Sequence, residues 1–154
     1  MLFEHKDKKR FPVSRTDASN PLSSYAPFAF ELDGAEWPTV EHYYQAMKFE
    51  DAAYRDTIRL AASPKEAAKL GKSRWQKRRA DWKKNTVTYM TRGSYIKCRQ
   101  YPEVAAALAE SGDTDIAEMS SYDYFWGCGR DMRGHNHFGK LWMGIRQKLR
   151  DEQA

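Results

Sequence analysis

The chain has 154 residues, which suffices for one domain with a hydrophobic core, and its 41% hydrophobic and 14% aromatic content argues against intrinsic disorder. No apolar run approaches the roughly 20 residues of a membrane span, and the first residues, Met1 to Lys6, are unlike a signal peptide. The two cysteines, Cys98 and Cys128, form no C-x-x-C pair, so we expect a reduced, cytoplasmic protein in which both thiols are packing groups rather than nucleophiles.

The net charge of +5 is distributed unevenly along the chain. Between residues 65 and 99 twelve lysines and arginines face only Glu66 and Asp81, a net charge of +10, and the remainder carries −5. Such a field attracts anions. Aromatic residues interleaved with the cations suit nucleobases and phosphates, and they are Trp75, Trp82, Tyr89 and Tyr95. The alternative is a solvated basic face with its aromatic side chains in the core, and the sequence leaves both open.

The first elements in chain order are a flank and a hairpin. Residues 1–19 form an N-terminal flank with at most one short strand. Residues 28–37 predict a β-hairpin, because Asp33-Gly34 suits a tight turn and large apolar residues alternate before it.

The next predicted element is a helix from Val40 to about Phe49, with Thr39 as its N-cap after Pro38. Three polar residues, Glu41, Gln45 and Lys48, lie at i, i+4 and i+7 of this helix and therefore share one face. The stripe is either an exposed polar face or the lining of a pocket.

Helices dominate the rest of the chain. We expect helices over 53–62, 64–70, 81–99, 102–110 and 138–149, with one strand near 116–119. Ser63 and Asp81 are the expected caps of the second and third of these helices. Gly93 interrupts the longest helix and indicates close packing, a ligand contact or a kink.

Several ordered motifs resemble one family. The run Trp37–Phe49 closely resembles the signature of the NADAR (YbiA-like) family of N-glycoside hydrolases. Further matches are the Asp81-Trp82 pair and the segments 21–25, 122–127 and 134–141. The resemblance covers roughly residues 20–150, and Ser24 occupies a position where the family has Asn.

The resemblance implies a compact single-domain YbiA-like fold that is mainly α-helical with a few short β-strands. It implies a domain over residues 20–150 and an N-glycosidase that needs neither a cofactor nor a metal. His135, His137 and Asp131 form too weak a pattern to predict a metal site.

Hydrolysis of an N-glycosidic bond passes through a sugar with oxocarbenium character, which carboxylates stabilise while they orient or deprotonate water. The resemblance places Glu41, Trp82 and Asp123 where the family has residues needed for activity. Glu41 is the expected main carboxylate, Asp123 the second, and Trp82 the wall beside the base. Further substrate-binding candidates are Ser24, Tyr44, Gln45, Lys48, Trp126 and Asn136.

Each main candidate also has a structural alternative. Glu41 could be a charge at a helix start, Asp123 could initiate a turn, and Trp82 could be a core residue. Asn136 suits the N-cap of the last helix equally well.

The family implies two substrate classes. One is ADP-ribose on guanine in DNA or RNA, which the +10 segment favours because a polymer gains affinity from phosphate contacts. The other is the phosphoribosylamino-pyrimidines of riboflavin synthesis. A third hypothesis, of another class, is a non-catalytic module that binds ADP-ribose or nucleic acid. The expected partner is therefore an ADP-ribosylated nucleic acid or a phosphoribosylated small molecule, without a membrane, and the oligomeric state is left open.

Overall fold

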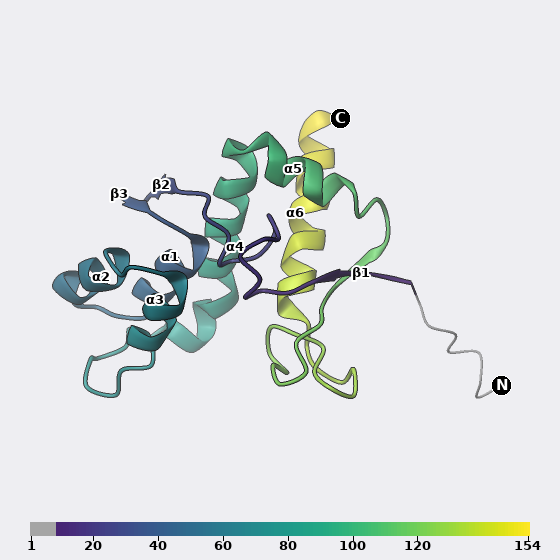
Figure 1. Ribbon diagram of the computed structural model, residues 1–154. Helices are drawn as coiled ribbons and strands as arrows, with labels where there is room; N and C mark the ends of the chain where they lie inside the picture. Colours follow the sequence, from purple (N-terminus) through teal and green to yellow (C-terminus); the bar gives the residue numbers. More distant parts are fainter. Residues whose placement is uncertain (1–8) are drawn as a thin grey trace.

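A central helix, α4 (Trp82–Gln100), runs through the molecule and the other elements pack around it (Figure 1). The computed structural model describes residues 9–154, so the first eight residues of the flank, and the predictions that concern them, lie outside the described residues. On one side of α4 lie a hairpin and three short helices: β2 (Phe30–Leu32), β3 (Ala35–Trp37), α1 (Val40–Ala46), α2 (Ala52–Arg59) and α3 (Pro64–Leu70).

The other side of α4 carries the last two helices and a pair of strands from the two halves of the chain. These elements are β1 (Arg10–Val13), α5 (Pro102–Ala109), β4 (Asp115–Glu118) and α6 (His137–Gln153). β1 pairs with β4 in parallel, with Val13 opposite Glu118, and α6 packs on β4. The expected mainly α-helical, single-domain fold with short strands is thus confirmed.

Local sequence explains most element boundaries. In the hairpin turn both Asp33 and Gly34 adopt positive φ, 53° and 80°, as a tight Asp-Gly turn requires. Helix α1 begins where predicted, because the Thr39 hydroxyl accepts a hydrogen bond from the His42 N–H at 3.2 Å. Helix α3 begins in the same way at Ser63, whose hydroxyl accepts from the Glu66 N–H.

The end of α1 and the capping hydrogen bond of Asp81 differ from the prediction. Helix α1 ends at Ala46 rather than Phe49, because Phe49 leaves the helix and forms a β-bridge with Arg78. Asp81 precedes α4 but makes no capping hydrogen bond within residues 9–154. Its carboxylate instead accepts hydrogen bonds from Arg79 Nε at 2.7 Å and Asn85 Nδ2 at 2.9 Å.

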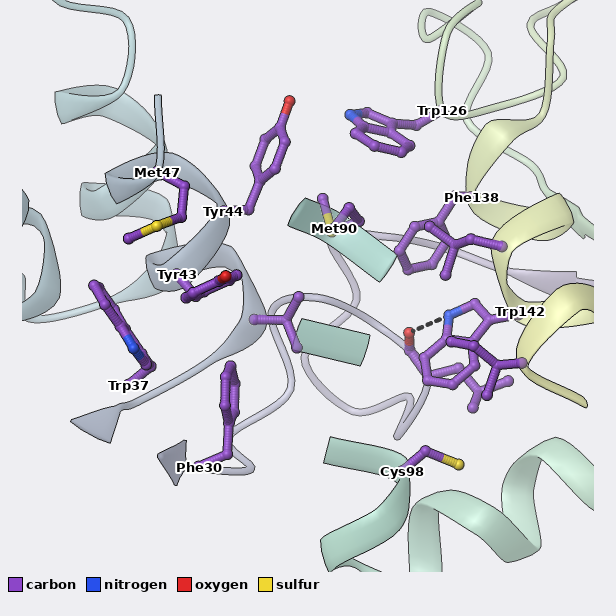
Figure 2. Close-up of a cluster of buried hydrophobic side chains, with 14 of the residues drawn as sticks. Phe30, Trp37, Tyr43, Tyr44, Met47, Met90, Cys98, Trp126, Phe138 and Trp142 are labelled. Carbon is purple, nitrogen blue, oxygen red and sulfur yellow. Dashed lines mark hydrogen bonds between the residues drawn. The ribbon is translucent and has the colours of Figure 1, made fainter. Parts of the chain in front are cut away.

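The core is rich in aromatic side chains drawn from both sides of α4 (Figure 2). The Trp142 indole donates a hydrogen bond to the Leu22 carbonyl at 3.0 Å, which ties α6 to the loop before the hairpin. Gly93 marks close packing: a Cβ there would lie 3.2 Å from Val40 Cγ1, so its absence lets α1 approach α4. Cys98 and Cys128 are both buried free thiols, as expected.

A buried lysine organises the loop that leads into the candidate site. Lys97 of α4 is 0% exposed, and its Nζ donates to the carbonyls of Pro21 and Ser23, each at 2.8 Å. Burial lowers the pKa of Lys97 to about 7. Hydrogen bonds to two carbonyls anchor this loop to the central helix, one residue before Ser24.

The helices of residues 9–154 lack the combination of length and apolar character that crossing a membrane requires.

Asn136 stands at the N-cap position of the last helix, but its side chain does not cap that helix. It adopts a left-handed conformation with φ of 52°, and within residues 9–154 its side chain makes no capping hydrogen bond. Its amide instead donates to the Ile116 carbonyl at 3.0 Å and accepts from the Glu118 N–H at 2.9 Å. Asn136 therefore holds the start of α6 against β4.

Replacing Asn136 with Ala should lower the free energy of unfolding by about 1–3 kcal/mol, because two buried backbone groups of β4 lose their partner. Urea denaturation of the two proteins measures the difference. Gln147→Ala on the exposed face of α6 is the matched control and should change stability by less than about 0.5 kcal/mol. An Asn136→Ala protein as stable as the control would contradict the bracing role.

Candidate active site

The polar stripe of α1 and of the turn that follows it faces inward. Glu41, Gln45 and Lys48 are only 0%, 5% and 9% exposed. The alternative of an exposed polar face is therefore wrong. Burying a carboxylate, an amide and an ammonium on one short segment is costly unless each is paired or serves a ligand, so the stripe is the natural starting point for a site.

Glu41 is paired with an arginine that the sequence did not point to. Arg15 Nη1 donates to both carboxylate oxygens of Glu41, at 2.8 Å to Oε2, and the Glu41 N–H donates to the Ser24 carbonyl at 2.9 Å. Although burial disfavours the charged form of Arg15, the Glu41 carboxylate raises the pKa of its guanidinium above the ordinary value. The Arg15 N–H donates to Glu118 of β4 at 2.7 Å.

Ser24 and Tyr25 border this ion pair. The Ser24 hydroxyl, 1% exposed, donates to the Arg15 carbonyl at 3.2 Å and accepts from Arg15 Nη1 at 3.4 Å. Ser24 therefore supports Arg15. Tyr25 is half-buried, and burial together with the nearby Glu41 charge raises the pKa of its phenol.

Tyr44 brings two tryptophans together next to the ion pair. Its ring centroid lies 5.3 Å from Trp82, at the start of α4, and 5.5 Å from Trp126, in the loop before α6. Figure 2 shows the Tyr44 and Trp126 rings as neighbours at the edge of the core, and their planes meet edge to face at 80°. Burial, reinforced by the Glu41 charge, raises the pKa of Tyr44 well above its ordinary value, so the phenol stays neutral at physiological pH.

Lys48 and Gln45 complete the buried stripe. Lys48 Nζ lies 5.3 Å from the centroid of the Tyr44 ring, and burial together with the nearby Arg78 charge lowers the lysine pKa to about 8. Gln45 Oε1 is buried and has no hydrogen-bond partner within residues 9–154, while Gly71 lies against it. A buried acceptor without a partner costs free energy, and a ligand donor would satisfy it.

Asp123 belongs to the loop that carries Trp126. Its Oδ1 accepts hydrogen bonds from the Phe125 N–H at 3.0 Å and the Trp126 N–H at 2.8 Å. The turn-forming alternative is therefore confirmed for this oxygen. Among the three predicted catalytic residues, Glu41 and Trp82 each adjoin Tyr44, whereas Asp123 supports the backbone behind Trp126.

A basic cleft adjoins the ion pair on the side of α3. Its volume is about 560 Å³, in the range of ligand pockets. Its lining residues are Tyr25, Ser63, Lys65, Glu66, Ala68, Lys69 and Lys72. Tyr25 connects the cleft to the surroundings of Glu41, and the lysines give it a charge that suits phosphate. Further hollows lie beside Trp37, about 460 Å³, and between α4 and α6, about 430 Å³.

The weak histidine pattern gains no support as a metal site. The His135 and His137 rings stack with centroids 5.3 Å apart and planes at 12°. Within the described part of the chain, no three His, Cys, Asp or Glu side chains gather in a way that could hold a metal ion.

Sequence reasoning missed Arg15 and Tyr25. Arg15 is 26 residues from Glu41 in a polar, turn-rich flank, and no periodic pattern singles it out. The one available signal was electrostatic: a carboxylate predicted to line a pocket needs a cationic partner. Tyr25 did lie in a segment that resembles the family, but its residue type alone named no role.

Comparisons with known proteins find one family and several similar chains. The model of the NADAR domain matches residues 2–150. The N-glycosidase of Nostoc punctiforme is 37% identical over 133 residues, covering 84% of this chain and 85% of that protein. The solved NMR structure of the Escherichia coli protein YbiA is 33% identical, has a TM-score of 0.84, and is matched over 95% of this chain and 88% of that chain.

A third relative is named for a biosynthetic pathway. The chloroplastic riboflavin biosynthesis protein PYRR of Zea mays is 36% identical over 149 residues, covering 86% of this chain but 24% of that protein. This chain therefore corresponds to one part of a longer plant protein.

Replacing Arg15 with Met should destabilise the fold by about 3–5 kcal/mol, because it leaves the buried Glu41 carboxylate unpaired. The double variant Arg15→Met with Glu41→Gln should regain much of this loss, since it removes the uncompensated charge. Urea denaturation of all four proteins gives the coupling free energy between the two residues. Additive losses in the double variant would show that the ion pair is not coupled.

Proposed function

This chain belongs to the NADAR family and is an N-glycosidase, and we propose that it removes ADP-ribose from guanine in DNA or RNA. The observation that carries the proposal is a buried carboxylate, Glu41, beside a wall of aromatic rings and a lysine-lined cleft. These three features match the three parts of such a substrate: the anomeric carbon, the base and the phosphates.

Glu41 is the group assigned to the reacting carbon. The bond between C1′ of the ribose and the base nitrogen breaks, and the electron pair leaves with the base. Water adds its oxygen to C1′, and one of its protons passes to the base. A buried carboxylate stabilises the developing positive charge on the ribose and orients the water. The contact of Arg15 Nη1 with both Glu41 oxygens, at 2.8 Å to Oε2, fixes the direction in which the carboxylate points.

The aromatic wall is assigned to the base. Trp82 and Trp126 meet at Tyr44, and flat rings of this kind bind nucleobases by stacking. Asp123 then acts as a positioning residue, because its carboxylate fixes the backbone of Trp126. Asn136 acts indirectly as well, since its amide is hydrogen-bonded to the backbone of β4 and holds the start of α6 in place.

The cations and the free amide oxygen are assigned to the rest of ADP-ribose. Lys48 and the cleft lysines of α3 attract the phosphates, which carry negative charge at every pH of interest. Gln45 Oε1, buried without a partner among the described residues, accepts from a ribose hydroxyl or a base amino group.

A second candidate substrate has its own support. The maize relative is named for riboflavin biosynthesis, which favours phosphoribosylamino-pyrimidines as the glycosides that are cleaved. These compounds present one phosphate, whereas ADP-ribose presents two together with an adenosine. The extended basic surface of residues 71–79 exceeds what one phosphate needs, and it favours the nucleic acid substrate.

Glu41→Gln should lower the rate of ADP-ribose release from a guanine-ADP-ribosylated oligonucleotide by about 10²- to 10⁴-fold, with ADP-ribose binding retained. Release is measured by chromatography and binding by calorimetry. Glu103→Gln on α5 is the matched control and should leave both unchanged.

Undiminished release by Glu41→Gln would remove Glu41 from the mechanism. If wild type releases nothing, the same pair of proteins is tested on phosphoribosylamino-pyrimidines. Failure on both substrates, with ADP-ribose still bound, would leave a non-catalytic reader of ADP-ribose.

The affinity for the phosphorylated substrate should depend on the protonation of Lys48. Its pKa of about 8 in the folded protein means that the ammonium is present below pH 8 and is lost above it. KM should therefore rise between about pH 7 and pH 9.5. In Lys48→Arg this rise should be absent, because a guanidinium stays charged throughout. An identical rise in both proteins would assign the titration to another group.

A further inference from the structure

The most exposed tryptophan of the described chain lies on a segment of concentrated positive charge. Trp75 is 96% exposed. It lies within residues 71–79, here termed the basic loop, which contains Lys72, Arg74, Lys77, Arg78 and Arg79 and no carboxylate. A large aromatic side chain left in water forgoes the stabilisation of burial, so its position suggests a binding partner.

The basic loop is held in a defined shape. Ser73 Oγ accepts hydrogen bonds from the N–H groups of Trp75 and Gln76, at 3.2 and 3.3 Å. At its far end the Arg79 N–H donates to the Lys48 carbonyl at 2.8 Å, and Arg78 forms a β-bridge with Phe49. The loop is therefore ordered, and its fold leaves the Trp75 ring exposed to solvent.

A second loop presents aromatic side chains in a similar way. Residues 119–136, here termed the aromatic loop, expose Tyr122 to 96%, and Tyr124 and Phe125 are partly exposed. This loop is also ordered, because the His135 N–H donates to the Tyr124 carbonyl at 2.8 Å and Asp123 forms the turn before Trp126.

The two loops flank the candidate active site. In the view of Figure 1 both lie along the lower edge of the molecule, the basic loop below α3 and the aromatic loop below α6. Tyr44 contacts Trp82, which follows the basic loop, and Trp126, which belongs to the aromatic loop. A chain that lies across both loops therefore passes close to Tyr44 and the two tryptophans beside it.

We propose that the basic loop and the aromatic loop together bind single-stranded nucleic acid on either side of the modified guanine, with flanking bases stacked on Trp75 and Tyr122. Single strands fit because their bases are free to stack on exposed aromatic rings while cations follow the phosphates. The cations of the basic loop supply the complementary charge, above all Lys72 and Arg74, because Lys77 is paired with Glu50 and Arg79 with Asp81. This proposal rests on the proposed function and adds recognition of the polymer around the modified nucleotide.

The test separates recognition of the polymer from catalysis. Two substrates are compared: guanosine that carries ADP-ribose on its base, and a single-stranded DNA of about 15 nucleotides with the same modified base. Each is given to wild type, Trp75→Ala and Tyr122→Ala. We expect unchanged kcat/KM on the nucleoside. On the oligonucleotide we expect a loss of roughly 5- to 150-fold for each variant.

Binding of the unmodified oligonucleotide, followed by fluorescence anisotropy, tests the surface even when no turnover is seen. Trp75→Ala and Tyr122→Ala should each weaken it, whereas Leu60→Ala, at an exposed apolar position directly after α2, should not. Arg74→Gln should reduce the slope of log Kd against log salt by about 0.7, and Lys148→Gln on α6 should leave it unchanged.

Two outcomes would overturn the proposal. One is equal binding of the unmodified oligonucleotide by wild type and the Trp75→Ala, Tyr122→Ala double variant. The other is concentration-dependent self-association that disappears in Trp75→Ala, which would identify this surface as a contact between copies of the chain. Failure of the proposed function is distinct from both: nucleoside and oligonucleotide would then remain uncleaved while the oligonucleotide still bound.

Discussion

The ion pair between Arg15 and Glu41 is the interaction on which the rest of the site depends. A carboxylate that is 0% exposed must find a partner, and that partner comes from the N-terminal flank. Arg15 is itself held by Ser24 and by Glu118, so the flank, the loop before the hairpin, α1 and β4 converge on one charge. Buried ion pairs contribute little net stability compared with apolar packing. A pair held from so many directions is better explained by the need to present a carboxylate in a fixed orientation.

Other buried polar groups extend the same design. Lys97 ties the loop of residues 21–24 to the central helix, and the next carbonyl of that loop accepts from the Glu41 N–H. Asn136 ties α6 to β4, which carries Glu118. Each of these side chains binds backbone atoms. Together they hold the backbone around the Glu41 carboxylate in place, and they are not groups that would bind the ligand. The groups left for a ligand are the aromatic wall, Gln45 and the cationic cleft.

Sequence signals that act locally predicted the fold well, because caps and turns depend on neighbouring residues. The Thr39 cap, the Ser63 cap and the Asp33-Gly34 turn all lie where their residue types indicate. Spacing also placed Glu41 and Gln45 on one face of α1, but it could not tell whether that face points to solvent or to the core. That choice depends on Arg15, whose contact spans 26 residues. For Asn136 the residue type permitted several roles, and only the position of β4 selects one.

The most direct test of where substrate binds is the tryptophan indole N–H signals in a two-dimensional NMR titration with ADP-ribose. The signals of Trp82 and Trp126 should shift with added ligand. The signal of Trp142, whose indole N–H is hydrogen-bonded to the Leu22 carbonyl in the core, should stay unchanged. Trp37 borders a separate hollow and should stay unchanged as well. A shift at Trp37 without one at Trp82 or Trp126 would place the ligand away from Glu41 and contradict the account.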